Sequence, residues 1–169
     1  MTRRQLPGVG LGVDVHRFGG PGPVRLGGVE IEHPQGLLGH SDGDVLCHAF
    51  ADALLGASGL GDIGEHFPSG EERWRGASSL DLLHRVGEML GSQGLEILGM
   101  DGTVIAEAPR LGPFRQEMQA MVAAVLSLDP GLVSVKVKSS DGLGLTGRGE
   151  GMAALAVARV GLGSRTDPE

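Results

Sequence analysis

The sequence predicts a single α/β domain of the α+β type, with one mixed sheet covered by about three helices. Two observations carry this prediction. Short apolar segments of strand length alternate with longer segments in which apolar residues recur every three or four positions. The 169 residues suffice for one domain with a proper core and are too few for two ordinary ones. We therefore expect one domain over 1–169, with its core at about 8–162.

The first third of the chain is predicted to contain two strands and a helix. Residues 8–16 and 24–31 have strand length and are joined by the turn sequence FGGPGP. A helix follows over 44–57, with one apolar face and with Gly56 and Gly59 as its stop. Ser41 or Asp42 is its expected N-cap.

The rest of the chain alternates between the two element types. A second helix over 78–91 has Ser78 as its N-cap, and a third helix lies near 113–127. Strands are predicted near 95–107 and over 132–138. The segment 152–160 fits a strand or a helix by pattern, and its position after a glycine-rich turn favours a strand. An open sheet of this size often needs a partner on its other face, so we expect an oligomer.

Composition argues against several classes of function. The net charge of −7 disfavours a dedicated nucleic-acid or anionic-membrane binder, and 3% aromatic residues offer few platforms for base stacking. No apolar run approaches the length of a membrane span. The single cysteine, Cys47, excludes an intramolecular disulfide and fits a reducing compartment, so we expect a cytoplasmic protein.

Three residues form a candidate metal site. Asp14 and His16 are two positions apart on the first predicted strand, so their side chains point to the same side. With His48 on the first helix they bring one carboxylate and two imidazoles, the ligand set of a catalytic zinc-type site with one open position. The alternative is that Asp14 ends the strand, His16 is a surface residue and His48 is a core histidine, since spacing alone does not show that strand and helix meet.

The neighbours of His48 suggest supporting roles. Asp44 and Asp52 lie one helical turn before and after it, so either is a candidate to orient its ring. Cys47 points about 100° away on the helix and is expected to be a buried core thiol. His40 lies beside the expected helix N-terminus, where backbone N–H groups favour an anion, and its imidazole can donate to a phosphate there.

A second candidate site lies in VKVKSSDGLGLTGRGEG, residues 135–151. Glycine-rich turns beside lysine, arginine and hydroxyl groups suit a phosphate, and Asp141 suits a hard cation such as Mg²⁺. The segment does not match a Walker A loop, and the alternative is a tight turn between two core strands. In APRLGPF, residues 108–114, entry into a helix accounts for the prolines but not for the charge of Arg110.

Four segments together resemble the 2-C-methyl-D-erythritol 2,4-cyclodiphosphate synthase family: DVHRF at 14–18, LGG at 26–28, GHSDGDVLCHAFADALLGASGLGDIGEHFP at 39–68 and TGRGEG at 146–151. The resemblance runs from about Gly8 to Leu162 in matching order and spacing. It implies a homotrimer around a central sheet-lined core, with active sites between subunits. The implied activity is that of a phosphorus–oxygen lyase of the non-mevalonate isoprenoid pathway, which converts 4-diphosphocytidyl-2-C-methyl-D-erythritol 2-phosphate to the cyclic diphosphate and CMP.

The resemblance also implies roles for individual residues. Zn²⁺ falls on the Asp-His-His trio, and the groups that stabilise the transition state fall on His40 and Ser139. A second ion, Mg²⁺ or Mn²⁺, would bind with the substrate diphosphate at Asp141. The implied substrate contacts are Ser41, Asp62, Ile63, Gly64, Phe67, Pro68, Ser69, Gly70, Glu71, Ala106, Glu107, Ala108, Pro109, Arg110, Leu111, Gly112, Lys138, Ser140, Leu145 and Arg148.

Several of these positions depart from the family's usual pattern. The loop that usually reads A-T-T-x-E is residues 137–141 here, VKSSD, which makes the carboxylate of Asp141 one methylene shorter. Ser69 stands where the family usually has Asp, Leu145 where it has Phe, and Arg110 where it has Lys. We expect Asp141 to matter at the second ion, Ser69 at the erythritol side of the substrate and Leu145 at an apolar contact, whereas Arg110 keeps the charge of the family's lysine.

Two other classes of function remain open at this point. A zinc hydrolase, such as a phosphodiesterase, would carry water at the open metal position, and a non-catalytic trimer would use the ion only to join subunits. On the synthase interpretation, the 2-phosphate oxygen attacks the β-phosphorus and CMP leaves. No protein nucleophile is then required, because alignment and charge neutralisation supply the catalysis.

Overall fold

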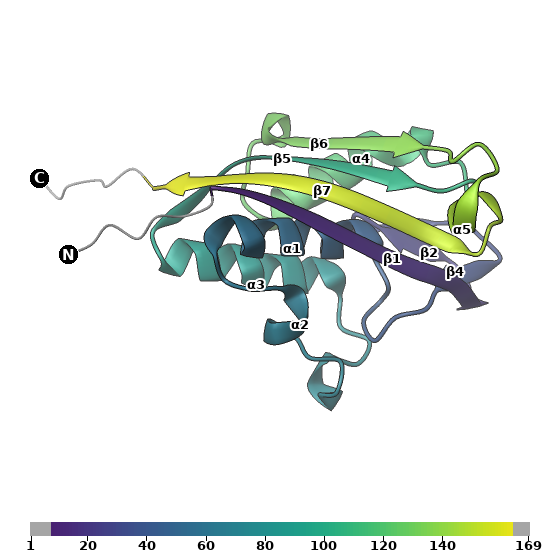
Figure 1. Cartoon of the computed structure of the whole chain (residues 1–169), viewed down its shortest axis with the longest axis horizontal. Helices are drawn as coiled ribbons and strands as arrows, with labels where there is room; N and C mark the ends of the chain where they lie inside the picture. Colours follow the sequence, from purple (N-terminus) through teal and green to yellow (C-terminus); the bar gives the residue numbers. More distant parts are fainter. Residues whose placement is uncertain (1–7, 164–169) are drawn as a thin grey trace, which may run out of the picture.

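The structure is a computed structural model that describes residues 8–163. A five-stranded mixed sheet forms its centre, in the order β4-β1-β7-β5-β6 (Figure 1). β5 and β6 pair in parallel, and the other neighbours pair antiparallel. The strands are β1 (Val9–Pro21), β4 (Gln35–Leu37), β5 (Leu95–Ile105), β6 (Val133–Lys138) and β7 (Gly151–Leu162). The predicted mixed α/β class is confirmed.

Three longer helices cover one face of this sheet, close to the predicted ranges. α1 (Val45–Ser58) packs on β1 and β7, α4 (Arg115–Val125) packs on β6, and α3 (Ser79–Ser92) lies against both helices (Figure 1). The shorter helices are α2 (Ile63–His66), α5 (Gly144–Gly147) and the 3₁₀ turns η1 (Glu72–Trp74), η2 (Gly112–Phe114) and η3 (Pro130–Leu132). Among residues 8–163, no helix has the length and apolar character needed to cross a membrane.

The first strands differ from the prediction. Residues 24–31 form a hairpin of β2 (Val24–Leu26) and β3 (Val29–Ile31) rather than one strand. Gly27 and Gly28 reverse the chain there. Their φ angles of 55° and 78° are backbone conformations that residues with a Cβ rarely adopt. β1 runs on through part of the expected FGGPGP turn, and the short β4 was not predicted. The ambiguous segment 152–160 lies within strand β7, as its position favoured.

The N-cap of α1 is Asp44, not Ser41 or Asp42. Its carboxylate accepts the N–H groups of Leu46 and Cys47 and, from the β2–β3 turn, that of Gly28. Asp44 is buried, so these three bonds satisfy a charge that would otherwise be costly to bury. The stop at Gly59 is confirmed, since this residue ends α1 in the left-handed conformation, whereas Gly56 lies inside the helix.

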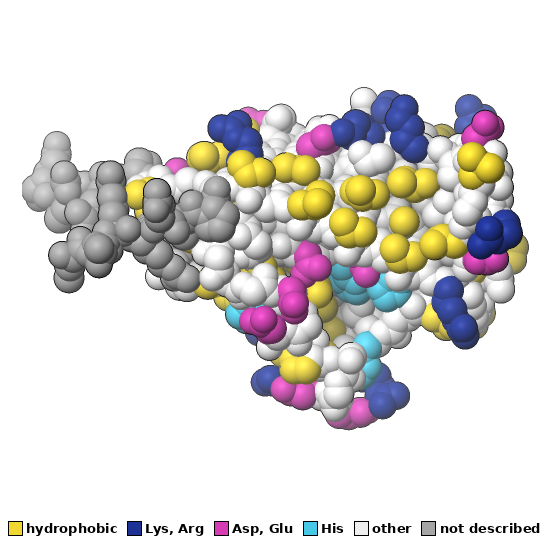
Figure 2. All heavy atoms as spheres, in the orientation of Figure 1, with side chains coloured by type: hydrophobic (Ala, Val, Ile, Leu, Met, Phe, Trp, Pro, Cys, Tyr) yellow, Lys and Arg dark blue, Asp and Glu magenta, His cyan; other side chains and the backbone are white. Residues whose placement is uncertain are grey.

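The opposite face of the sheet is apolar, and none of the helices within residues 8–163 covers it. Along β1 the side chains alternate, so Leu11, Val13 and Val15 point away from α1, and Leu11 is 65% exposed. Leu155 and Val157 of β7 continue the same surface. Figure 2 shows a band of apolar side chains along the molecule. We refer to Val9, Leu11, Val13, Val15, Leu155 and Val157 as the apolar sheet face.

Candidate metal and substrate site

Two glycines of β1 bring the strand into backbone contact with α1. A Cβ on Gly10 would stand 2.0 Å from the carbonyl oxygen of Ala53, and a Cβ on Gly12 would stand 1.9 Å from that of Ala49. Any side chain at these positions would therefore push the helix off the sheet. The alternation of glycine on the strand and alanine on the helix is the sequence signal that the two elements meet.

The same contact brings the predicted Asp-His-His trio together. Asp14 Oδ2 lies 2.9 Å from His48 Nδ1 and 3.1 Å from His16 Nε2. One ligand atom of each residue lies within 4.8 Å of the others, and within residues 8–163 this is the one such group of at least three. Strand and helix therefore do meet, and Asp14 lies inside β1 rather than at its end, so that part of the alternative is wrong.

The remaining ring nitrogens show why the trio fits a cation. His16 Nδ1 faces the carbonyl oxygen of Leu38, which can only accept, so this nitrogen carries the proton. Its Nε2 lone pair then points at the carboxylate of Asp14. Two acceptors face each other stably only when a proton or a metal ion lies between them, and one carboxylate with two imidazoles is a donor set for a divalent ion.

The pKa shifts in the trio have the same origin. Burial raises the pKa of Asp14, but when both imidazoles are protonated, with protons in place of a metal ion, their hydrogen bonds to the carboxylate outweigh burial and hold the pKa well below its usual range. The hydrogen bond to Asp14 raises the pKa of His16, against the effect of burial. The carboxylate therefore stays ionised and attracts positive charge into the trio.

A cavity of about 250 Å³ opens beside the trio. It is lined by His16, His40, Ser41, His48, Ile63, Gly64, Phe67, Ser69, Trp74 and Leu82. In Figure 2 histidine side chains lie below the apolar band, where the surface is hollowed. Sequence reasoning missed Trp74 and Leu82. The ring of Trp74 meets that of Phe67 edge-on at 5.0 Å, so the one tryptophan of the chain extends an aromatic wall that Phe67 begins.

The side chains of the two aspartates expected to orient His48 hydrogen-bond to backbone N–H groups instead, so this expectation is wrong. Asp44 caps α1, and Asp52 Oδ1 accepts the N–H of Ile63 at 2.8 Å, which ties α2 to α1. Burial is the main reason that the pKa of Asp52 is raised. Asp62, an implied substrate contact, caps α2 by accepting the N–H of Glu65. Cys47 is fully buried as expected, and burial raises the pKa of its thiol.

Other implied contacts of the first cavity lie around its rim. His40 Nε2 is 3.2 Å from the carbonyl oxygen of Glu71, which places this imidazole at the segment after α2. Pro68 and Gly70 belong to the same segment, and the carboxylate of Glu71 pairs with Arg73 at 2.5 Å. This ion pair is exposed, so the side chain of Glu71 is not committed to the trio.

A second cavity, of about 290 Å³, lies at the ends of β5 and β6. Its lining residues are Ala106, Glu107, Pro109, Arg110, Leu111, Gly112, Val137, Lys138 and Ser139, and it shares none with the first cavity. Lys138 pairs with Ile105, which pairs with Ala153, which pairs with Val15 beside the trio. Three strand spacings therefore separate Lys138 from β1, about 14 Å.

Glu107 organises the loop that follows β6. Its Oε1 accepts the N–H of Ser140 at 2.9 Å, the hydroxyl of Ser140 at 3.0 Å and the N–H of Gly142 at 3.3 Å. These bonds, with that from Gly142 first, lower the pKa of Glu107. Asp141 has φ of 56° and donates its N–H to Ser139 Oγ at 2.8 Å. No local pattern in the sequence indicates that Glu107 holds this loop.

The remaining implied contacts lie on the turn before β7. Arg148 Nε donates to Glu150 Oε1 at 2.7 Å, and Arg148 Nη2 donates to the other carboxylate oxygen at 3.3 Å. This partner raises the pKa of Arg148. Leu145 is exposed at the same turn. The charge of Arg148 is thus matched by an acidic neighbour two residues away.

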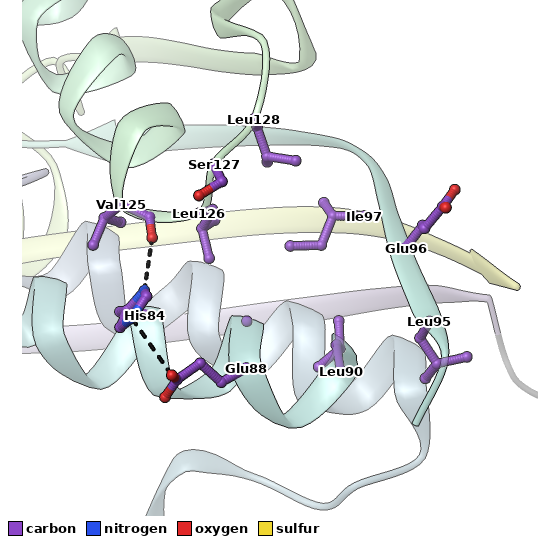
Figure 3. A pocket seen from close by; sticks show the side chains of 11 residues that line it. His84, Glu88, Leu90, Leu95, Glu96, Ile97, Val125, Leu126, Ser127 and Leu128 are labelled. Carbon is purple, nitrogen blue, oxygen red and sulfur yellow. Dashed lines mark hydrogen bonds and ion pairs between the residues drawn. The ribbon is translucent and has the colours of Figure 1, made fainter. Parts of the chain in front are cut away.

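A third cavity, of about 440 Å³, lies away from both sites, between α3, the start of β5 and the end of α4 (Figure 3). His84 Nδ1 contacts the carbonyl oxygen of Val125 at 2.9 Å, and its other nitrogen is 3.7 Å from Glu88. Leucine side chains form much of the lining, and none of the predicted site residues is part of it. Size alone therefore does not identify the site.

Comparison with known proteins points in one direction. A model of the YgbB family matches residues 8–161. A 2-C-methyl-D-erythritol 2,4-cyclodiphosphate synthase of Pelotomaculum thermopropionicum is 53% identical over 152 residues, which are 90% of this chain and 94% of that protein. The bifunctional IspDF of Campylobacter jejuni superposes with a TM-score of 0.88 at 42% identity, covering 91% of this chain and 42% of that one. A CDP-bound form of a 2C-methyl-D-erythritol-2,4-cyclodiphosphate synthase superposes with a TM-score of 0.82 at 35% identity, covering 90% and 99%.

Proposed function

Because the chain belongs to the YgbB family, we propose how its residues divide the work of a cyclodiphosphate synthase. The enzyme is a lyase that converts 4-diphosphocytidyl-2-C-methyl-D-erythritol 2-phosphate to 2-C-methyl-D-erythritol 2,4-cyclodiphosphate and CMP, in isoprenoid precursor biosynthesis. Relatives of this name at about half identity exclude the non-catalytic trimer and argue against the hydrolase. The observation that carries the proposal is the convergence of Asp14, His16 and His48 beside a cavity.

The trio is the proposed Zn²⁺ site. A bound Zn²⁺ supplies Lewis-acid polarisation and charge neutralisation to phosphate oxygens. Asp14 contributes the negative charge, and the hydrogen bond of His16 to the Leu38 carbonyl fixes its tautomer. His40 and Ser41 line the same cavity, where they can hold the 2-phosphate next to the trio.

The second cavity is the proposed site for the cytidine diphosphate part. Lys138 and Arg110 bring positive charge to its lining, and Ser139 brings a hydroxyl that can stabilise the transferred phosphoryl group. Asp141, next to it on the Glu107-bound loop, is the proposed ligand of Mg²⁺ or Mn²⁺. The 2-phosphate oxygen then attacks the β-phosphorus in line, the bond to the CMP oxygen breaks, and no group of the protein is phosphorylated.

The proposed assembly is a homotrimer whose active sites lie between subunits. Two observations support it. The two cavities share no lining residue, and Lys138 of the second cavity lies three strand spacings, about 14 Å, from the strand that carries Asp14 and His16, so each cavity fits one half of a site completed by a neighbour. The apolar sheet face is large and uncovered, as expected of a surface buried by association. The proposed setting is the reducing cytoplasm, which the free buried Cys47 supports.

The test is incubation of the protein with the cytidyl substrate and a divalent ion, with products identified by phosphorus NMR. We expect the cyclic diphosphate and CMP in equal amounts. Release of inorganic phosphate or of a linear diphosphate would favour the zinc hydrolase. Mass spectrometry during turnover should find no phosphate on Ser139 or His40, and a trapped phospho-enzyme would overturn direct transfer.

A further inference from the structure

A buried hydroxyl outside the predicted site faces the metal ligand His48. Ser79, the first residue of α3, is 1% exposed, and its Oγ lies 2.9 Å from His48 Nε2. The same Oγ donates to Asp42 Oδ1, and the backbone N–H of Ser79 donates to Asp42 Oδ2 at 3.1 Å. The contact comes from a helix that sequence reasoning did not connect with the trio.

The positions of the protons follow from these partners. A serine hydroxyl has one proton, and here it goes to the carboxylate of Asp42, which can only accept. The lone pairs of Ser79 Oγ are then left to accept the proton on His48 Nε2. With its proton on Nε2, His48 turns an unprotonated Nδ1 toward Asp14 Oδ2, 2.9 Å away.

Ser41 competes for the same nitrogen, and the structure distinguishes the two serines. Ser41 Oγ is also 2.9 Å from His48 Nε2. However, Ser41 is only partly buried and lines the first cavity, and its other contacts are long: its Oγ accepts the N–H of Gly43 at 3.3 Å and lies 3.3 Å from Ser79 Oγ. Ser79 is held at two atoms by Asp42, whose own N–H donates to the carbonyl oxygen of Ala77. Ser79 is therefore the fixed partner and Ser41 the one that can turn to a ligand.

We propose that Ser79, held by Asp42, is a positioning residue that sets the tautomer and ring orientation of His48 for metal binding. The proposal rests on the Zn²⁺ site of the proposed function. In many metal sites a carboxylate behind a ligating histidine fixes the orientation of the ring. Here the hydroxyl of Ser79 lies between the carboxylate of Asp42 and the ring of His48. By occupying Nε2, Ser79 also leaves the hydroxyl proton of Ser41 to the substrate phosphate, while the Ser41 oxygen keeps the N–H of Gly43.

A purely structural role for Ser79 predicts something different. The N-cap of α3 is Ser78, which accepts the N–H of Asp81, so the hydroxyl of Ser79 is not needed to begin the helix. Removing it should leave α3 formed while the ring of His48 loses its anchor. The metal affinity then changes without a matching loss of fold.

The experiment compares Zn²⁺ affinity by competition with a chromophoric chelator in the wild type, Ser79→Ala, Ser79→Thr and Ser41→Ala. Loss of such an outer partner typically weakens metal binding about 10- to 100-fold, which we expect for Ser79→Ala. Ser79→Thr keeps the hydroxyl and should recover most of the affinity. Ser41→Ala should keep the affinity and raise KM instead.

Two further measurements make the test decisive. Nitrogen-15 NMR of the imidazoles should find the proton of His48 on Nε2 in the wild type and a mixture of tautomers in Ser79→Ala. Asp42→Asn, which keeps an oxygen acceptor, should weaken Zn²⁺ binding less than Ser79→Ala does. Unchanged Zn²⁺ affinity in a folded Ser79→Ala protein, or a larger loss in Ser41→Ala, overturns the proposal. If the wild type showed no synthase activity but Ser79→Ala still weakened Zn²⁺ binding, the proposed function would be refuted and this role of Ser79 supported.

Discussion

The Asp-His-His trio and the loop at 138–142 lie toward the same end of the sheet, yet different forces hold them. The trio stands on a strand and a helix whose backbones touch at Gly10 and Gly12, with partly buried hydrogen bonds behind it. The loop is exposed, and the carboxylate of Glu107 fixes it through three hydrogen bonds. We refer to these regions as the packed half and the loop half of the site.

The difference matches what each half is proposed to bind. Ligand atoms must converge on a metal ion within a few tenths of an ångström, and close-packed regular elements achieve such precision. A flexible diphosphate tolerates more variation, and a loop held by hydrogen bonds can adjust to it. Substitutions should therefore act on the packed half through sterics and on the loop half through hydrogen bonding.

The largest expected effect is that of Gly12→Ala in the packed half. The new Cβ would stand 1.9 Å from the carbonyl oxygen of Ala49, so α1 must move away from β1. Overpacking of this kind costs about 1–3 kcal/mol or more, and the shift also separates His48 from Asp14. We expect a lower melting temperature and the loss of stoichiometric Zn²⁺, measured by calorimetry and metal analysis.

Gly91→Ala is the matched control. Gly91 lies in α3, and a Cβ there meets nothing within 4 Å. Alanine should stabilise the helix by about 0.5–1 kcal/mol relative to glycine. If Gly12→Ala and Gly91→Ala behaved alike, backbone contact between β1 and α1 would not be what holds the packed half together.

The second effect in size is that of Leu11→Asp on the apolar sheet face, which tests whether the two halves meet between subunits. If this face is the buried contact of the proposed trimer, a charge at its centre should dissociate the assembly, as light scattering would show. The trio lies within one chain, so Zn²⁺ should stay bound while turnover falls at least about 100-fold. Met121→Asp, on the exposed side of α4, is the control and should leave both unchanged. A monomer with full activity would contradict the proposal that the active site lies between subunits.

The packed half was largely predictable and the loop half was not. Period-two spacing placed Asp14 and His16 on one side of a strand, and helical spacing placed His48. The three side chains come together because the glycines of GVGLG pack against the backbone at Ala49 and Ala53. These two segments lie some 40 positions apart in the chain, so the contact cannot be read from either segment alone. The roles of Ser79 and Glu107 depend on contacts with residues more than 30 positions away, which no local pattern encodes.

Third in size is the effect of Glu107→Ala in the loop half. Without its carboxylate, the N–H groups of Ser140 and Gly142 lose their acceptor and the loop carrying Ser139 and Asp141 becomes mobile. Misplacement by about 1 Å can cost up to about 100-fold in rate, so we expect kcat to fall by as much as that. The melting temperature and Zn²⁺ content should stay near the wild type, because the packed half is untouched.

Glu107→Gln sharpens this prediction. The amide oxygen still accepts hydrogen bonds but has no charge, so activity should be intermediate between those of the wild type and Glu107→Ala. If Glu107→Gln were as slow as Glu107→Ala, the charge rather than the loop geometry would be what matters. Loss of Zn²⁺ in either variant would contradict the separation of the two halves.

The smallest effect is expected at Asp52, which ties the short helix α2 to α1 next to the packed half. Burial, with contributions from Asp62 and Asp14, raises the pKa of Asp52, although the N–H of Ile63 acts in the opposite direction. A carboxyl whose pKa is higher in the folded chain binds its proton more tightly there. Its contribution to stability is therefore present at low pH and lost as the pH rises through the folded-state pKa.

Asp52→Asn removes this dependence while its amide oxygen still accepts the N–H of Ile63. The variant and the wild type should melt alike near about pH 4, and the variant should become the more stable one toward about pH 7. Because Asp52 is only half buried, we expect a gain of less than about 1 kcal/mol. The opposite result would be a variant that is less stable than the wild type at neutral pH and equally stable in acid. It would mean that the charge of Asp52 strengthens its hydrogen bond to Ile63 by more than the burial of that charge costs.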